Sequence, residues 1–280
     1  MIVDTSGGWL YIIGMTVINP KPTETPKPIM RVTNLKDVNE HSYVKMLISG
    51  QSGAGKTSLL GTLPGKTLVI SGESGTMPLE GRDIDIVDLS ISDTVKGDDG
   101  KPMVLRDAAK RIAKFRATFD WLHAGAPDAK GKPSGYLNVC LDSLTEISET
   151  FVEDLNRQFP DRKDSFPMWG EYSKIMRSIV KNLRDLPYNV IITVLSKQEK
   201  DDIGKRYMGF DVAGSISDRL PQYFDEVFYL HVDNEGKRSI ITRKTDTLIC
   251  KDRSNKLLPQ EDADLGEIMR KIMLRKEEGK

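Results

Sequence analysis

The chain contains few cysteines, and this scarcity excludes two classes of protein. Only two of the 280 residues are cysteine, Cys140 and Cys250, and each lies in an apolar segment typical of a buried strand. Two such isolated thiols make neither a disulfide framework nor a zinc site with the usual ligand spacing. We therefore expect both to be reduced core residues of a cytosolic protein.

The chain also lacks a net charge and a long apolar run. Lys plus Arg and Asp plus Glu each total 41, so the formal net charge is zero and any nucleic-acid site must be a local patch. No apolar segment approaches the roughly 20 residues that cross a membrane. The apolar segment from Trp9 to Met15 is short and follows Asp4 rather than a basic cluster, which disfavours a signal peptide. These absences predict a cytoplasmic protein without a membrane partner.

The length of the chain allows one large α/β domain with appendages. Prolines recur from Pro20 to Pro28, where they can neither donate to a strand ladder nor continue a helix. We predict a flexible proline-rich leader over residues 1–30, with a partner-binding tail as the alternative. The folded core is predicted over residues 31–262, and residues 263–280 are predicted to be a terminal amphipathic helix and a charged tail.

The strongest motif lies between residues 44 and 60. An apolar, β-prone run precedes it and leucines follow it, so the motif stands between a predicted strand and a predicted helix. It fits the pattern G-x-x-x-x-G-K-[ST], and the predicted nucleotide-binding residues are Gly50, Gln51, Ser52, Gly53, Ala54, Gly55, Lys56, Thr57 and Ser58. The alternative is a glycine-rich turn that matches by chance, and the flanking strand and helix argue against it.

The residue types of this loop suit a nucleoside triphosphate. Glycines let the backbone curl so that its N–H groups point at phosphate oxygens. The side chain of Lys56 is long enough to reach the β- and γ-phosphates, and the hydroxyl of Thr57 is a ligand for Mg²⁺. ATP and Mg²⁺ are therefore the predicted cofactors.

Two acidic residues follow predicted strands. The apolar run at residues 136–141 ends in Asp142, which is the Walker B pattern, in which the carboxylate orders the Mg²⁺ shell. The alternative is an aspartate that caps the next helix. Glu73 follows the strand predicted at residues 66–71, and the carboxyl ends of strands carry the site in an open α/β sheet. Asp142 is therefore the predicted partner of Thr57 at the metal.

The remaining periodicity completes an α/β pattern. Apolar spacing predicts helices at residues 105–123, 145–159, 169–186 and 265–274, and strands at residues 84–89 and 189–196. A hairpin is predicted at residues 226–243, followed by a closing strand at residues 247–253. Ser196 and Lys197 end a predicted strand, where a polar group could sense the γ-phosphate, although an exposed lysine after a strand is the commoner case.

The segment at residues 201–221 combines glycines and charges with the aromatic residues Tyr207 and Phe210. Its weak periodicity predicts a mobile loop. Such a loop suits single-stranded nucleic acid, because cations meet phosphates and rings stack on bases. A charged surface loop without a ligand is the alternative.

Together these motifs resemble those of phage-type RecA-like ATPases, the AAA-type phage nucleotide-binding proteins that include the Sak-class single-strand annealing proteins. The resemblance covers residues 43–260 and rests on the phosphate loop with V-I-S-G-E, L-D-S-L-T-E, W-G-E-Y and K-D-R-S-x-K-L. It implies an α/β, RecA-like P-loop NTPase fold with a mostly parallel central sheet, flanking helices and a C-terminal β-hairpin.

The resemblance also implies roles for single residues. Glu73 would be the catalytic glutamate that activates water, acting beside Lys56. Lys197 stands where RecA-like proteins often carry a glutamine that senses the γ-phosphate, and this departure leaves the coupling mechanism open. Lys251 and Arg253 resemble the K-x-R pair that hexameric relatives insert into a neighbour's site, so turnover would require self-association.

The function implied by the resemblance is ATP hydrolysis in phage DNA recombination or single-strand annealing. Residues 157–168 and 199–218 would occupy the two DNA-facing loops and bind single-stranded DNA, with phage recombination or single-strand-binding proteins as candidate partners. Two alternatives stay open: a nucleotide-gated binding and assembly module with little turnover, and a P-loop small-molecule kinase. The K-x-R pattern, the hairpin and the absence of an arginine-rich lid argue against the kinase.

Overall fold

The computed structural model describes residues 43–73, 75–90, 92–96, 102–159 and 166–273. The described residues all belong to the second of two units of the chain, which spans residues 41–280. The predicted leader, the start of the predicted core and the charged tail after residue 273 lie outside the described residues.

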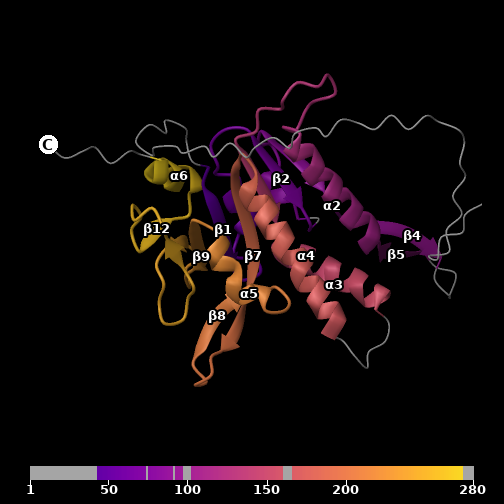
Figure 1. Ribbon diagram of the computed structural model, residues 1–280. Helices are drawn as coiled ribbons and strands as arrows, with labels where there is room; N and C mark the ends of the chain where they lie inside the picture. The colour runs from indigo at the N-terminus through magenta and orange to yellow at the C-terminus, as the bar shows by residue number, and fades with distance from the viewer. Residues whose placement is uncertain (1–42, 74, 91, 97–101, 160–165, 274–280) are drawn as a thin grey trace, which may run out of the picture. The chain divides into compact units, whose positions relative to one another are not determined.

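A central sheet runs through the second unit (Figure 1). Among the described residues its strand order is β12-β10-β9-β1-β7-β6-β2-β3, and every neighbouring pair from β9 to β3 is parallel. Antiparallel pairs join β10 to β9 and β12, β11 to β9, and β8 to β7. The strands are β1 (Lys45–Gly50), β2 (Thr67–Ser71), β3 (Ile84–Asp88), β6 (Asn138–Asp142), β7 (Asn189–Lys200), β8 (Arg206–Phe210), β9 (Glu226–Val232), β10 (Arg238–Ile241), β11 (Lys251–Asp252) and β12 (Gln260–Asp262).

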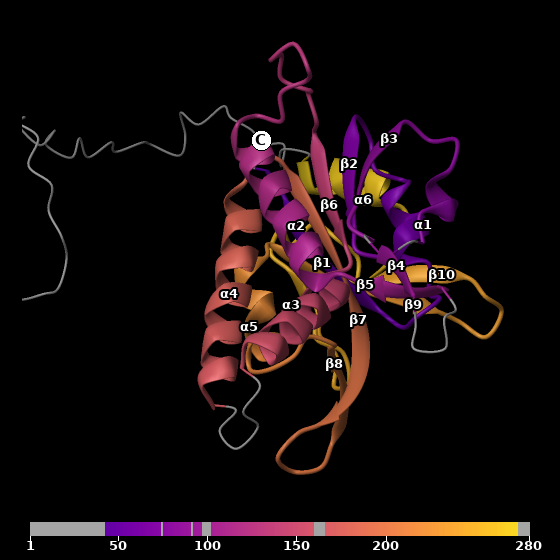
Figure 2. The ribbon, with the colours of Figure 1, turned by 90° about the vertical axis from the view of Figure 1, so that its right-hand side faces the viewer.

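Helices cover both faces of this sheet (Figure 2). Helices α2, α3 and α4 pack on one face, and α1 and α6 pack on the other. Their bounds are α1 (Lys56–Leu60), α2 (Ala108–His123), α3 (Leu144–Gln158), α4 (Phe166–Asp185), α5 (Ile216–Arg219) and α6 (Leu265–Met273), with 3₁₀ turns η1 (Met77–Leu79) and η2 (Leu220–Tyr223). Within the part of the chain that the structure describes, no helix has the length and apolar character to cross a membrane.

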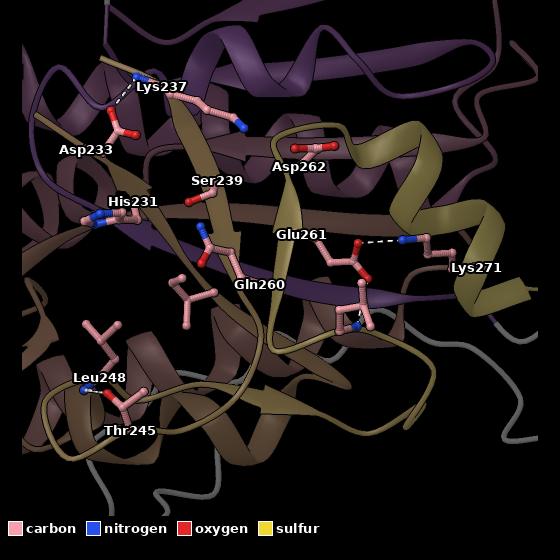
Figure 3. A pocket seen from close by; sticks show the side chains of 12 residues that line it. His231, Asp233, Lys237, Ser239, Thr245, Leu248, Gln260, Glu261, Asp262 and Lys271 are labelled. Atoms are coloured by element: carbon pink, nitrogen blue, oxygen red, sulfur yellow. Dashed lines mark hydrogen bonds and ion pairs between the residues drawn. The ribbon is translucent and has the colours of Figure 1, made fainter. Parts of the chain in front are cut away.

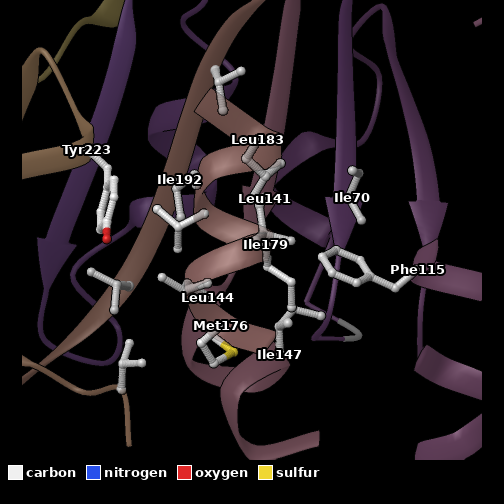
Figure 4. Close-up of a cluster of buried hydrophobic side chains, with 14 of the residues drawn as sticks. Ile70, Phe115, Leu141, Leu144, Ile147, Met176, Ile179, Leu183, Ile192 and Tyr223 are labelled. Carbon is white, nitrogen blue, oxygen red and sulfur yellow. The ribbon is translucent and has the colours of Figure 1, made fainter. Parts of the chain in front are cut away.

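The apolar run of β7 illustrates how the core forms. Val190 and Ile192 belong to the cluster that includes Phe115 of α2 and Met176 of α4 (Figure 4), whereas Ile191 belongs to the cluster on the α1 and α6 side. Successive strand residues point to opposite faces, so consecutive apolar residues suit a strand that is covered on both faces. The predicted mostly parallel sheet, flanked by helices and carrying a C-terminal hairpin from β9 to β10, is confirmed.

The prediction of a mobile loop at residues 201–221 is wrong. Strand β7 does not end at Ser196 but continues to Lys200, and it pairs with β8 in a hairpin that extends beyond the sheet (Figures 1 and 2). At its turn, the Asp201 carboxylate accepts N–H bonds from Ile203 and Lys205. Alternating charges in this arm hid its strand pattern, because neither of its faces is fully apolar.

A second hairpin was also absent from the predictions. Strands β4 (Ser92–Lys96) and β5 (Pro102–Arg106) pair with each other outside the central sheet. These strands are short and β5 begins with a proline, which weakens a strand signal. The following helix begins at Ala108 rather than Leu105, because the Asp107 side chain accepts the N–H of Lys110 and caps it.

Candidate nucleotide-binding site

The predicted phosphate loop follows the carboxyl end of β1. Because β1, β7, β6 and β2 are parallel, their carboxyl ends meet at one edge of the sheet, where Gly50 is level with Leu195 and Ser71 with Asp142. Gly53 and Gly55 have φ values of 75° and 96°, a left-handed conformation that favours glycine. The motif therefore forms a tight loop, as predicted, at the edge of the sheet where the parallel strands have their carboxyl ends.

Lys56 closes this loop on itself. Its Nζ donates to the carbonyl oxygens of Gly50 at 3.0 Å and Gln51 at 2.9 Å, and the residue is 8% exposed. Burial lowers the pKa of Lys56, while the nearby charges of Asp142 and Glu73 act in the opposite direction. A buried ammonium held by neutral carbonyls is suited to an anionic ligand, which fits the phosphates of a nucleotide.

Asp142 is held between two hydroxyl groups. Thr57 Oγ1 donates to Asp142 Oδ2 at 2.6 Å, and Thr193 of β7 donates to Asp142 Oδ1. Hydroxyl and carboxylate oxygens are the ligands that Mg²⁺ prefers, so the pair Thr57 and Asp142 fits this ion. The part of the chain that is described has no group of three His, Cys, Asp or Glu residues able to hold a metal. The capping alternative for Asp142 is wrong, because Ser143 caps α3.

Glu73 lies beside Asp142 at the same edge. The N–H of Gly72 donates to the carbonyl oxygen of Asp142 at 2.7 Å, and Ser143 Oγ donates to Glu73 Oε1 at 2.8 Å. The peptide bond between Asp142 and Ser143 is cis. Glu73 is exposed to solvent. The structure thus brings Lys56, Thr57, Asp142 and Glu73 together.

A buried ion pair behind Glu73 was absent from the sequence predictions. Arg111 of α2 donates through Nη2 to Gly72 O at 2.8 Å and to Glu146 Oε2 at 3.2 Å, and through Nε to Leu89 O at 3.1 Å. These bonds fix the backbone that precedes Glu73. Two signals could have indicated the pair: Arg111 interrupts an otherwise apolar helix face, and Ser143 with Glu146 fits the S-x-x-E capping pattern.

Lys197 is not part of this group. It lies within the β7–β8 hairpin, level with Gly209, rather than at the end of a strand. Its Nζ forms ion pairs with Glu199 at 3.3 Å and Asp211 at 3.9 Å, and it lines a cavity of about 520 Å³ with residues of α3. Ser196, the other candidate sensor, has a buried hydroxyl without a hydrogen-bond partner in the described part of the chain.

Lys251 and Arg253 lie at the opposite edge of the sheet. Lys251 is level with Val227 near the amino end of β9, and its Nζ donates to the carbonyl oxygens of Pro221 and Phe224. Arg253 pairs with Asp225 at 2.9 Å, with its side chain 69% exposed. Neither side chain contacts the phosphate loop of its own chain, and a role in a neighbouring copy stays a prediction. Of the two, only Arg253 is exposed enough to be offered to a partner.

The other flank of the phosphate loop is bordered by the β9–β10 hairpin. A cavity of about 440 Å³ lies between loop residues 51–54 and residues 229–232 of β9. Arg238 of β10 reaches the loop as well, with its Nε donating to Ala54 O at 2.9 Å. Sequence reasoning missed this residue, because nothing in a hairpin sequence indicates which loop lies beside it.

The fold and the group at its carboxyl edge define a RecA-like P-loop NTPase: a parallel sheet, a glycine-rich loop after its first strand, and a threonine and an aspartate placed for a metal. The family model described as an AAA domain matches residues 42–254. The chain therefore belongs to this family of AAA-type P-loop ATPase domains.

Other comparisons are more distant. Among solved structures, the chain is similar to a prototypical ATPase from the type III secretion system of pathogenic bacteria, with 18% identity and a TM-score of 0.37. The match covers 69% of this chain and 52% of that one, so the chain spans about half the length of the secretion ATPase. The chain has no significant match among curated proteins.

Proposed function

We propose that this chain hydrolyses ATP and acts on single-stranded DNA in recombination or strand annealing, as an assembly of several copies. The observation that carries the hydrolytic part is the convergence of Lys56, Thr57, Asp142 and Glu73 at one edge of the sheet. A phage origin and a kinship with Sak-class annealing proteins are supported by the sequence resemblance alone.

Each residue of the group has a defined task in this proposal. Bound Mg²⁺ and ATP supply a neutralised, electrophilic γ-phosphoryl group. Lys56 exchanges its carbonyl partners for phosphate oxygens, and Thr57 with Asp142 provides the protein oxygens for the metal. Glu73 accepts the proton of an attacking water while Ser143 holds its other oxygen in place. Arg253 of a neighbouring copy would stabilise charge that develops on the γ-phosphate.

The β7–β8 hairpin supports the DNA part of the proposal. It begins on the strand that carries Thr193, the partner of Asp142, and it extends beyond the sheet with Lys200, Lys205 and Arg206 along it. Cations on a projecting arm suit the phosphates of a single strand. The other candidate DNA segment, residues 157–168, falls partly outside the described residues.

A nucleotide-gated binding module is the second candidate, and the charge of the same hairpin favours it. Lys197 is paired with Glu199 and Asp211, and Asp201 and Asp202 stand at the turn beside Ile203, which is 87% exposed. A tip with acidic and apolar side chains suits a protein partner better than a phosphate backbone. DNA binding that weakens steeply with salt would favour the first candidate.

The test is ATP hydrolysis with and without single-stranded DNA at several protein concentrations, with Lys56→Ala as the blank. We expect DNA to stimulate turnover, and the rate to rise more than linearly with protein concentration because sites are shared between copies. A rate that is proportional to protein concentration and indifferent to DNA would favour the binding module.

A further inference from the structure

Arg238 brings a second cation to the phosphate loop from a distant part of the chain. It opens β10, 184 residues after Ala54, and its Nε donates to the carbonyl oxygen of that residue at 2.9 Å. An arginine has five N–H donors, so this bond uses one of them. In the part of the chain that the structure describes, the other N–H groups of the Arg238 guanidinium form no hydrogen bond, and the guanidinium forms no ion pair with a carboxylate.

The guanidinium lies directly against Gly55. A Cβ atom added to Gly55 would lie 2.6 Å from Arg238 Nε, 2.8 Å from Cζ and 3.1 Å from Nη2. Arg238 therefore occupies the space that a side chain at position 55 would need. This contact falls in the middle of the motif, one residue before Lys56, where phosphate-binding N–H groups are gathered.

The strand register explains how Arg238 reaches this position. Ser49 near the end of β1 is level with Tyr229 of β9, so β9 continues past β1 along the phosphate loop. Arg238 is level with Val232 at the far end of β9. Since β1 stands between β9 and β7, the hairpin borders the loop on the flank opposite to Asp142.

We propose that Arg238 is a nucleotide-contacting residue, whose free N–H groups bind the phosphate chain on the flank away from Asp142 while Nε holds the loop. The inference rests on nucleotide binding at the phosphate loop, as in the proposed function. The planar guanidinium, with several donors on one side, matches the geometry of phosphate oxygens. The geometry supplies an unpaired cation at a site for a polyanion.

The adjacent lysine provides a matched control. Lys237 lines a cavity of about 750 Å³ on the other face of the β9–β10 sheet, together with Ser239 and Gln260 (Figure 3). Its removal takes the same charge from the same hairpin without touching the loop. A long-range effect of net charge would therefore appear in both variants, whereas a contact would appear only at Arg238.

The experiment measures the dissociation constants of fluorescent ADP and ATP with Mg²⁺, without DNA, for the full chain carrying Arg238→Met, Arg238→Lys or Lys237→Met. We expect Arg238→Met to bind both nucleotides about tenfold or more weakly, Arg238→Lys to recover part of the loss, and Lys237→Met to match the original protein. The loss should shrink between about 0.05 M and 0.5 M salt, because screening weakens a charge contact.

Three results would overturn the proposal in a protein that binds nucleotide. Affinities of Arg238→Met within twofold of the original protein would remove the contact. A loss of nucleotide affinity that does not change with salt would show that Arg238 only stabilises the conformation of the loop. The same conclusion would follow if Arg238→Lys binds nucleotide as weakly as Arg238→Met while its melting temperature without nucleotide is unchanged. If the original protein itself fails to bind nucleotide, the proposed function fails first and this inference falls with it.

Discussion

Asp142 and Glu226 are both buried carboxylates, 6% and 1% exposed, but they stand at opposite edges of the same sheet. Each oxygen of Asp142 accepts a bond from a threonine hydroxyl. Glu226 accepts the N–H of Ser254 with Oε1, whereas its Oε2 has no partner in the described part of the chain. Burial, together with the charge of Asp252, raises the pKa of Glu226 to about 7.

The difference lies in which cation each edge can receive. At the carboxyl edge, Thr57 can turn from Asp142 toward a metal ion, so the carboxylate exchanges one favourable partner for another. At the amino edge, the negative charges of Asp225 and Asp252 act on Glu226, so the binding of a proton to Glu226 reduces the repulsion among the three carboxylates. Asp142 therefore has a polar partner on each oxygen, whereas Glu226 reduces the stability of the fold when it ionises.

The largest expected effect is at the carboxyl edge. Lys56→Ala removes the ammonium that neutralises phosphate charge, so nucleotide binding or turnover should be abolished while the melting temperature without nucleotide changes little. Nucleotide binding and hydrolysis measured beside Lys66→Ala, a lysine remote from the loop, check this. Hydrolysis at the original rate in Lys56→Ala would show that the phosphate loop is not the active site.

The next largest expected effect concerns Arg253, which lies at the amino edge and would act on the carboxyl edge of a neighbouring copy. If Arg253 acts on a neighbouring copy, Arg253→Ala should lower turnover about 10⁴-fold, because an arginine finger stabilises charge in the transition state. Mixing this variant with Lys56→Ala should restore activity, since mixed interfaces combine an intact loop with an intact Arg253. Lys244→Ala, which removes an exposed lysine, serves as the control. The absence of rescue at every ratio would confine Arg253 to its bond with Asp225.

Glu73→Gln separates binding from chemistry within the carboxyl edge. The amide keeps an acceptor for Ser143 but cannot take a proton, so hydrolysis should fall about 10³-fold with nucleotide affinity unchanged. The single-turnover rate and the nucleotide dissociation constant are compared with those of Glu80→Gln, which changes an exposed glutamate. Normal turnover in Glu73→Gln would move the general base to another residue.

The smallest expected effect is at the amino edge and concerns stability. Because the folded-state pKa of Glu226 is raised from 4.5 to about 7, its favourable contribution is complete below pH 4.5 and is lost as the pH rises through 7. Glu226→Gln stays neutral, so it should gain on the order of 3 kcal/mol over the original protein by pH 8 and nothing near pH 4.

Denaturant unfolding of both proteins from pH 4 to pH 8 tests this prediction, with the exposed Glu235→Gln as the control. A stability difference that is independent of pH would show that the ionisation of Glu226 is not its cause. Nucleotide binding by Glu226→Gln should be unchanged, because Glu226 lies at the opposite edge of the sheet from the phosphate loop of the same chain.

Residues that act through local spacing were predictable. The loop from Gly50 to Thr57 is contiguous, so its glycines and Lys56 appear as a motif. Asp142 ends an apolar strand, and Glu73 follows another by two residues. Parallel strands bring their carboxyl ends to one edge, which makes the meeting of these residues foreseeable. The predictions failed in the β7–β8 hairpin, where a projecting arm has no buried face to impose a period on its sequence.

By itself, the sequence determined the class of fold, the phosphate loop and the carboxylates beside it, because each depends on short-range spacing and on the direction of strands. Only the tertiary structure decided the partners from distant segments: Arg238 against Ala54, Arg111 behind Gly72, and Lys251 turned into its own chain. The sequence around a long polar side chain does not indicate which distant residue it contacts. Its role is settled when strand order and register place a free donor beside a free acceptor.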